Sequence, residues 1–96
     1  MLTQNIIGYE LSSAGTQTLN GFKPGTQENP PGAFAVATEA EVAQAMQKAQ
    51  SAWRVYRQVS GQQRGVFLRA IAEAIENQGD TLVQRAIAES GLPEGR

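Results

Sequence analysis

The segment Thr38-Glu39-Ala40-Glu41-Val42 opens the longest helical pattern in this sequence of 96 residues. A threonine followed three residues later by a glutamate is the pattern of a capping box. In that motif the hydroxyl accepts from the N3 amide, and the carboxylate reaches back to the N-cap amide. Apolar side chains then recur at spacings of three and four, as on one face of a helix. These positions are Val42, Ala45, Met46, Ala49, Ala52, Trp53, Tyr56 and Val59. The sequence therefore predicts a helix that begins just after Thr38.

Two further helices are predicted downstream of the first. Ser60-Gly61-Gln62-Gln63 repeats the capping box with glutamine in place of glutamate, so it begins a second helix. Gly79 can adopt the left-handed conformation that follows a last helical turn, and Asp80 can cap a third helix. Gly91-Leu92-Pro93 ends the third, because proline cannot continue a helix. We therefore expect three helices that break near Ser60 and Gly79. Their inner stripes are Phe67, Ala70, Ile71, Ala74 and Ile75, and then Leu82, Val83, Ala86 and Ile87.

The first 37 residues lack a helical pattern and are rich in glycine and proline. They contain five of the ten glycines and three of the four prolines, so no helix runs through them. Alternating side chains over residues 5–11 predict a strand, and residues 12–15 have the composition of a turn. A short return strand over residues 16–19 would complete a β-hairpin. The first strand is expected to carry Ile7, Tyr9 and Leu11 on one face.

The sequence thus divides at residue 37. Residues 1–37 form a β-hairpin and a Pro/Gly-rich loop, in which residues 33–37 are an extended lead into the first helix. Residues 38–96 form a segment of three helices. Taken by itself, the chain is predicted to be α+β, with the hairpin before the helices.

Composition limits what this chain can do alone. It is 41% hydrophobic, but 14 of those residues are alanine, which leaves few large side chains to fill a core. A chain of this size buries only about 60–65% of the surface that its unfolded form exposes, so its independent stability is small. The chain has no cysteine and therefore no disulfide, thiolate ligand or thiol nucleophile. It also has no histidine, the residue most used for acid–base catalysis near pH 7.

The charge pattern gives no sign of a nucleic-acid protein. The net charge is −1, whereas nucleic-acid binding usually requires a basic excess. Arg54, Arg57, Arg64 and Arg69 follow one another with no acid between them. They could pair with acids on neighbouring segments, or they could form a phosphate-binding patch. The first interpretation is favoured, because no glycine-rich cradle or aromatic interleaving accompanies them.

No targeting or membrane segment is predicted. The first residues lack the basic stretch and apolar run of a signal peptide. No stretch approaches the ~18 apolar residues of a membrane span. We therefore expect no membrane partner, and we take the cytoplasm as the default location.

The polar side chains do not suggest a catalytic or metal site. Glu73 and Glu76 share a helix face, but no histidine accompanies them, so a solvated face is the simpler interpretation. Ser60 and Ser90 lack a neighbouring base and are expected to act as an N-cap and a helix-end residue. The turn sequences around Gly21 and Gly25 lack the spacing of a phosphate-binding loop. We therefore predict no catalytic, cofactor-binding or metal-binding residue in this chain.

The order of these landmarks resembles the amino-terminal region of the aldehyde dehydrogenase superfamily. No single motif is specific, but their order along the chain is. Within the superfamily, Gly91-Leu92-Pro93 resembles the corresponding sequence in the branch of ketoglutarate-semialdehyde and NADP-linked fatty-aldehyde dehydrogenases. Lys23 departs from the asparagine or aspartate usual in that family's first turn. The matching segments are Ile6-Ile7-Gly8-Tyr9, Phe22-Lys23-Pro24-Gly25-Thr26 and residues 37–53, 57–60, 64–68 and 88–96.

The resemblance implies an enzyme that oxidises aldehydes to carboxylic acids with NAD or NADP. In that family a cysteine thiolate attacks the aldehyde, hydride passes to the coenzyme, and a glutamate-activated water releases the acid. All of those groups lie beyond Arg96 in the family, so none is carried over to this chain. The full-length fold would be α/β with a Rossmann-type coenzyme domain, of which residues 1–37 and 38–96 form the leading part. The implied partners are the remainder of the dehydrogenase chain, an aldehyde substrate and further copies in a homo-oligomer.

A second interpretation is a freestanding helical adaptor or protein-interaction module without catalytic activity. The two hypotheses differ in what should cover the apolar side chains. If the chain is part of a dehydrogenase, the stripes around Trp53 and Phe67 and the face of Ile7, Tyr9 and Leu11 should stay incompletely covered within it.

Overall fold

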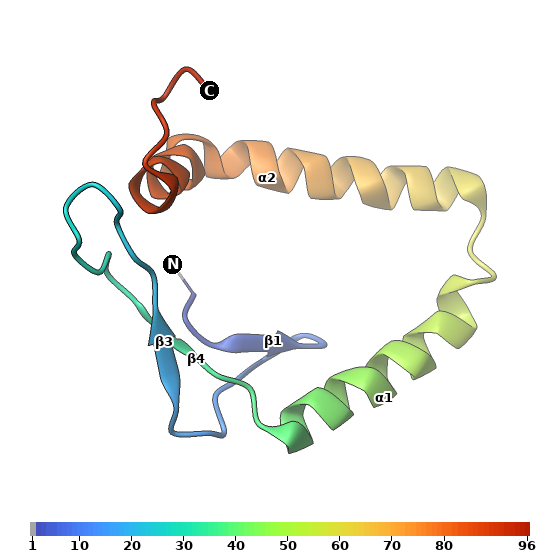
Figure 1. Ribbon diagram of the computed structural model, residues 1–96. Helices are drawn as coiled ribbons and strands as arrows, with labels where there is room; N and C mark the ends of the chain where they lie inside the picture. Colours follow the sequence, from blue (N-terminus) through green and yellow to red (C-terminus); the bar gives the residue numbers. More distant parts are fainter. Residues whose placement is uncertain (1) are drawn as a thin grey trace. The chain divides into compact units, whose positions relative to one another are not determined.

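The computed structural model describes residues 2–96, which form two compact units. Unit 1 is the chain through Gly21 together with Pro31–Gln58, and unit 2 is Phe22–Pro30 together with Val59–Arg96. Figure 1 shows the order of the elements along the chain. The described residues contain the strands β1 (Asn5–Ile7), β2 (Glu10–Ser12), β3 (Thr18–Asn20) and β4 (Ala33–Ala35), and the helices α1 (Glu39–Tyr56) and α2 (Gly61–Ser90).

Strands β1 and β2 form a tight antiparallel hairpin in which Ile7 pairs with Glu10. Gly8 and Tyr9 are the two loop residues, and Gly8 has a φ of 67°. A glycine with positive φ at the first loop position is typical of the type II′ turn, which suits the twist of a hairpin. The prediction of one strand over residues 5–11 is therefore wrong, because the chain reverses at Gly8 and divides that segment into two strands.

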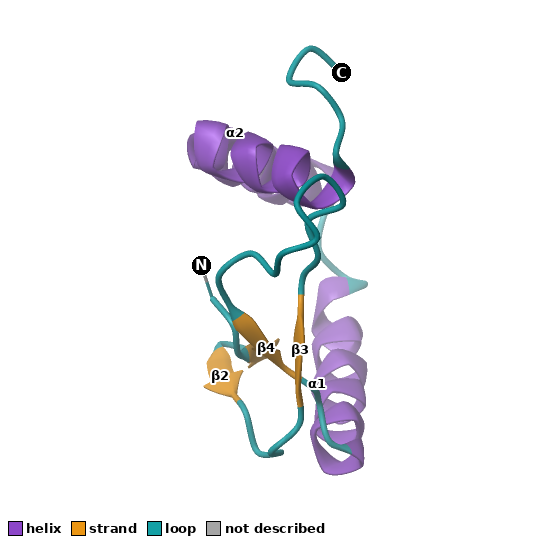
Figure 2. Cartoon of the chain, turned by 60° about the vertical axis from the view of Figure 1, so that its left-hand side comes forward, coloured by secondary structure: helices purple, strands orange, loops and turns teal. Residues whose placement is uncertain are grey.

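Strands β3 and β4 form a second antiparallel pair, with Leu19 opposite Phe34. The backbone N–H of Val36 donates to the carbonyl of Gln17 at 3.0 Å and extends this pairing. The predicted return strand thus exists, but its predicted partner is wrong. It pairs with the extended segment before α1, because β1 already pairs with β2 through the Gly8 turn. Figure 2 shows these strands in orange.

Helix α1 begins as the sequence predicts. The Thr38 hydroxyl accepts from the Glu41 amide, and the Glu41 carboxylate accepts from the Thr38 amide, so both halves of the capping box are present. At the other end, the N–H of Arg57 donates to the carbonyl of Trp53 at 2.9 Å. The chain then leaves the helix before Ser60.

Helix α2 confirms the predicted break at Ser60, whose side chain accepts from the Gln63 amide as an N-cap. The predicted break near Gly79 is also present, but as a kink within α2, so the expected third helix is not a separate element. Gly79 has non-helical angles, with φ of 44° and ψ of −127°, but helical structure resumes at the next residue. Two helical segments therefore meet at a kink at Gly79 within α2, and Asp80 is the first residue after the kink. Gly91 ends the helix in the left-handed conformation, with a φ of 70°.

The loop of unit 2 closes on itself before it meets the end of α2. The N–H of Lys23 donates to the carbonyl of Glu28 at 2.9 Å, and the N–H of Gln27 donates to the carbonyl of Lys23 at 2.8 Å. Pro24 lies next to Gly91, where a β-carbon on the glycine would stand 3.8 Å from the proline ring. Residues of unit 2 that are far apart in sequence therefore meet at this point.

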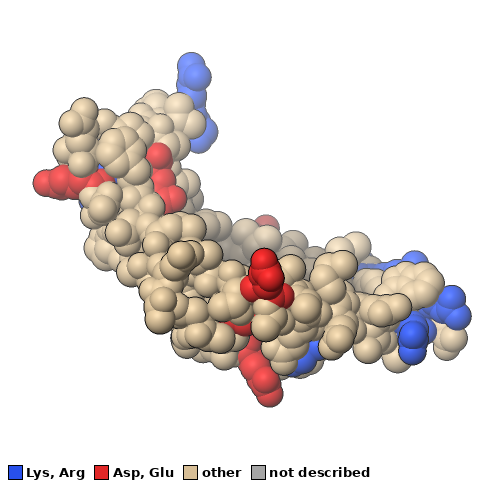
Figure 3. All heavy atoms as spheres, turned by 60° about the horizontal axis from the view of Figure 1, so that its bottom comes forward, with Lys and Arg blue, Asp and Glu red and all other residues tan. Residues whose placement is uncertain are grey.

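Very little apolar surface is buried within the described residues. Among residues 2–96, Ile7, which is 6% exposed, is the one buried hydrophobic residue, and α2 contains no buried residue. Figure 3 shows a face on which most atoms belong to uncharged residues. The predicted exposure of apolar faces is confirmed, except that Ile7 itself is covered. The exposed large hydrophobic residues include Tyr9, Leu11, Val42, Met46, Trp53, Val66, Phe67, Leu68, Ile75 and Leu82.

Candidate functional site

The most densely bonded polar group of unit 1 is the Glu41 carboxylate, which is 4% exposed. Its Oε1 accepts from the Ser12 hydroxyl and, at 3.2 Å, from the N–H of Ala14. Its Oε2 accepts from the N–H of Thr38 at 2.8 Å and from the Thr38 hydroxyl at 3.1 Å. One side chain therefore caps α1 and also fastens the segment after β2 to that cap.

These donors determine the protonation state of Glu41. The Ser12 hydroxyl and the N–H groups of Thr38 and Ala14 lower the pKa of Glu41 from 4.5 to about 2, against an opposing effect of burial. The carboxylate is consequently ionised at neutral pH, and its lone pairs are directed at fixed donors. A carboxylate with so low a pKa is a poor general base near pH 7, because an efficient base has a pKa close to the working pH. Glu41 is a structural anchor.

Lys48 holds the other end of the hairpin against α1. Its Nζ donates to the carbonyl of Ile7 at 3.4 Å and lies 3.9 Å from a carboxylate oxygen of Glu10. A β-carbon on Gly8 would come within 3.1 Å of the lysine side chain. The absence of a side chain at Gly8 thus serves both the turn and the close approach of Lys48.

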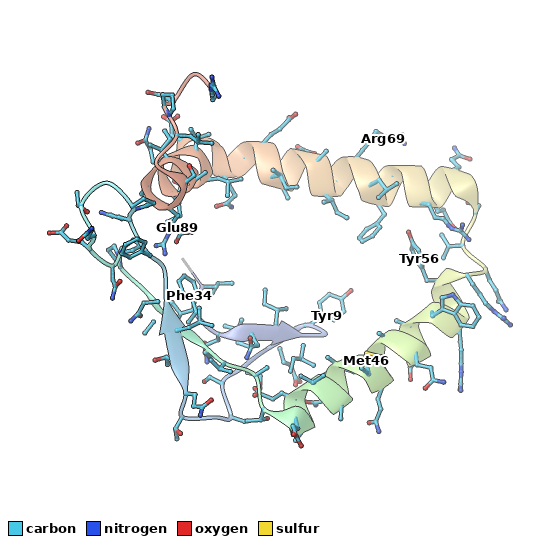
Figure 4. The ribbon with its side chains drawn as sticks, viewed as in Figure 1. Tyr9, Phe34, Met46, Tyr56, Arg69 and Glu89 are labelled. Atoms are coloured by element: carbon cyan, nitrogen blue, oxygen red, sulfur yellow. The ribbon has the colours of Figure 1, made fainter. Side chains whose placement is uncertain are left out.

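Between Glu41 and Lys48, β1 and α1 enclose a largely apolar groove with a volume of about 240 Å³. Figure 4 shows Met46 on the side of α1 that faces the β1–β2 hairpin. The groove has one charged lining residue, Glu41, whose oxygens already accept from the donors described above. Its lining is Asn5, Ile6, Ile7, Ala37, Glu41, Val42, Ala45 and Met46. The groove can therefore accept apolar side chains but offers no group for acid–base chemistry.

The arginines of the sequence analysis do not fall within one unit. Arg54 and Arg57 belong to unit 1, whereas Arg64 and Arg69 belong to unit 2. The guanidinium carbon of Arg57 lies 4.9 Å from the centre of the Trp53 ring, a cation–π distance. This stacking accounts for one of the four arginines without any phosphate ligand.

The serines have the helix-end positions that the sequence predicts. Ser60 caps α2 through a 3.2 Å bond from the N–H of Gln63. The Ser90 hydroxyl donates to the carbonyl of Ala86 at 2.6 Å and accepts from the N–H of Leu92 at 3.2 Å. Both hydroxyls therefore satisfy helix ends.

Glu73 and Glu76 are exposed on α2, as predicted. Within residues 2–96, no group of three potential metal-ligating side chains comes together. Neither of the helices described there has the length and apolar character needed to cross a membrane.

Sequence reasoning found the capping role of Glu41 but missed its link to Ser12 and Ala14. The capping-box pattern reports only contacts three residues apart, whereas Ser12 lies 29 residues away. The groove was missed for a related reason, because its β1 wall depends on the chain reversal at Gly8. A glycine within an alternating pattern is the signal that could have indicated that turn.

Comparison with known proteins gives a consistent result. The aldehyde dehydrogenase family matches residues 11–95. Alpha-ketoglutaric semialdehyde dehydrogenase 2 of Azospirillum brasilense is 41% identical over 93 residues, covering 95% of this chain and 18% of the relative. Alpha-ketoglutaric semialdehyde dehydrogenase of Acinetobacter baylyi is 47% identical over 60 residues, covering 62% of this chain and 11% of the relative. No solved structure matches the chain significantly.

The chain spans less than a fifth of the length of these curated relatives. The match with the family nevertheless extends over most of the 96 residues, from the middle of β2 to the last residues. The resemblance inferred from the sequence is confirmed. The chain belongs to the aldehyde dehydrogenase family.

Proposed function

We propose that this chain is the N-terminal part of an NAD(P)-dependent aldehyde dehydrogenase that oxidises an aldehyde to a carboxylic acid. The observation that carries the proposal is the family match over residues 11–95, together with relatives of which the chain spans only 18% and 11%. Both relatives are named for a ketoglutarate semialdehyde, so we further propose an aldehyde of that class as the substrate.

The described residues do not fit a dinucleotide site. Pyrophosphate recognition uses free backbone amides at a helix N-terminus after a glycine-rich turn. At the start of α1, the amides of Thr38 and Glu41 donate to side chains of the capping box. At the start of α2, the Gln63 amide donates to Ser60. We therefore assign coenzyme binding to the part of the dehydrogenase that lies outside these 96 residues.

We also assign the oxidation of the aldehyde to the part of the dehydrogenase outside these 96 residues. Thiohemiacetal formation needs a thiolate, and the chain has no cysteine. The contribution that we propose for the chain is structural: it forms the leading part of the coenzyme-binding domain and does not contact the reacting atoms. Homo-oligomer formation and a cytoplasmic location remain predictions.

The comparisons do not favour the freestanding adaptor. Exposed apolar side chains occur in adaptors too, but an adaptor hypothesis does not account for a family match across most of the chain. The two hypotheses also differ in whether the reading frame continues into a catalytic region.

The test is an assay of two proteins side by side. The 96-residue chain and the polypeptide encoded by its continued reading frame are each titrated with NAD⁺ and NADP⁺ by calorimetry. Each is then assayed for NAD(P)H absorbance with short and long aldehydes. We expect binding and turnover from the longer polypeptide alone, and loss of its turnover when its catalytic cysteine is replaced. Turnover by the 96-residue chain would contradict the proposal, as would a longer polypeptide that oxidises no aldehyde.

A further inference from the structure

The groove between β1 and α1 is lined by apolar side chains that remain open to solvent. Ile6 is 64% exposed, and Val42 and Met46 are 53% and 68% exposed. Fully burying one such side chain contributes about 1.5–3 kcal/mol, so leaving several exposed along one groove is unfavourable. These residues lie together on one face, and so the groove is a candidate contact surface.

Helix α1 has the exposed side chains of Val42 and Met46 on the groove side and polar side chains on the opposite face. The face of the helix away from the groove carries Gln44, Gln47 and Ser51, which are polar and exposed. Ser51 lies nine residues from Val42, about half a turn away around the helix at 100° per residue. An apolar stripe opposite a polar face indicates that α1 is built to be covered on the groove side only.

The walls of the groove are fixed before anything enters it. Glu41 fastens the segment after β2 to the start of α1, and Lys48 fastens the β1 end to the middle of the helix. Both bonds join residues that are distant in sequence. A preformed groove binds its occupant at a lower entropic cost than one that must form on contact.

We infer that this groove is occupied by an apolar segment of the same dehydrogenase polypeptide, outside the 96 residues described. Relatives continue over more than four times the length that this chain spans, which provides a covalently linked occupant. The charged lining residue, Glu41, is already bonded to Ser12, Ala14 and Thr38, so a cationic partner would gain no free carboxylate there. Aliphatic or aromatic side chains are therefore the expected contacts.

The inference rests on the proposed function, and cysteine labelling can separate the two. The natural chain has no cysteine, so a single introduced thiol in it reports on one position. Met46→Cys and Val42→Cys place a thiol at the groove, and Ser51→Cys places a matched thiol on the polar face. Each substitution is made in the 96-residue chain and in the longer polypeptide, and the labelled peptide is quantified by mass spectrometry.

We expect Cys labelling at positions 42 and 46 to be at least about tenfold slower in the longer polypeptide than in the chain alone, as for a site exposed only by local opening. Labelling of the Ser51→Cys variant should be fast in both proteins. Fast labelling at 42 and 46 in a catalytically active longer polypeptide would overturn the inference and leave the proposed function standing. Slow labelling in the longer polypeptide that becomes fast on dilution would identify a second copy as the occupant and also overturn it. A reading frame that ends at Arg96, or a longer polypeptide without dehydrogenase activity, would remove the proposed function and the inference together.

Discussion

Unit 1 and unit 2 hold their side chains by different kinds of interaction. In unit 1, Glu41 bonds to Ser12 and Lys48 bonds to the Ile7 carbonyl, which are contacts across 29 and 41 residues. In α2 of unit 2, Arg85 pairs with Glu89 one turn away at 2.6 Å, and the helix contains no buried residue. Local bonds stabilise a helix but do not fix its place in a fold. We infer that α2 depends more than α1 on surfaces outside this chain.

The largest expected effect concerns the whole 96-residue chain in isolation. Because Ile7 is the one buried hydrophobic residue described, the purified chain should self-associate or unfold without a sharp transition. Thermal circular dichroism with light scattering provides the measurement. A monodisperse monomer with cooperative unfolding at high temperature would contradict this expectation and favour the adaptor hypothesis.

Removing the charge of Glu41 should give the next largest effect, confined to unit 1. A neutral amide accepts weaker hydrogen bonds than a carboxylate, so Glu41→Gln should make the Ala14 and Thr38 amides exchange several times faster. Hydrogen exchange measured by NMR in the longer polypeptide tests this expectation. Glu39→Gln is the matched control, because Glu39 lies in the same helical turn but is exposed. Equal acceleration in both variants would show that only the helix dipole matters.

The same variant gives a prediction about pH. The pKa of Glu41 is lowered from 4.5 to about 2 in the folded chain, so its stabilising contribution is complete above about pH 4.5. As the pH falls from 4.5 towards 2, this contribution should be lost. Protection of the Ala14 amide should therefore decrease over that window in the natural sequence and much less in the Glu41→Gln variant. An identical pH profile for the two would contradict the role of the ionised carboxylate.

A smaller effect is expected from Gly8→Ala. The positive φ at Gly8 costs a non-glycine residue about 1–2 kcal/mol, and the new β-carbon would also displace Lys48. The midpoint of urea unfolding of the longer polypeptide should decrease accordingly. Gly25→Ala is the control, because nothing lies within 4 Å of the β-carbon it would add. If Gly8→Ala unfolded at the same urea concentration as Gly25→Ala, the result would contradict a requirement for glycine at the turn between β1 and β2.

The smallest effect is expected from Ser60→Ala, which removes the N-cap of α2. Loss of a serine cap typically costs about 1 kcal/mol and should loosen the first turn of the helix, including the Gln63 amide. Ser51→Ala, within α1, provides a comparison in which no cap is lost. We expect faster exchange of the Gln63 amide in the Ser60→Ala variant alone. Unchanged exchange there would show that Ser60 does not stabilise the start of α2.

Local features of the fold were predictable from the sequence. The capping box at Thr38, the break at Ser60 and the end at Gly91 each depend on contacts within a few residues, and the structure confirms them. The break at Gly79 was predictable as well, but the sequence does not show whether positive φ there ends a helix or kinks it. The residue permits both outcomes, and the pattern after it is helical in either case.

The pairing of the strands and the groove were not predictable in the same way. β3 has the composition of a strand, but its partner is 15 residues downstream across the loop of unit 2. Such pairings depend on which edges are left open after the Gly8 turn forms, and alternation of side chains does not report this. The tertiary roles of Glu41 and Lys48 follow from the same pairing.

We expect the remainder of the dehydrogenase polypeptide to cover both α2 and the groove. The most direct test is hydrogen–deuterium exchange of the α2 amides in the 96-residue chain and in the longer polypeptide under the same conditions. We predict rapid exchange along α2 in the chain alone and protection higher by a factor of about 100 or more in the longer polypeptide, since a packed helix opens far less often. Strong and equal protection of α2 in both proteins would contradict the claim.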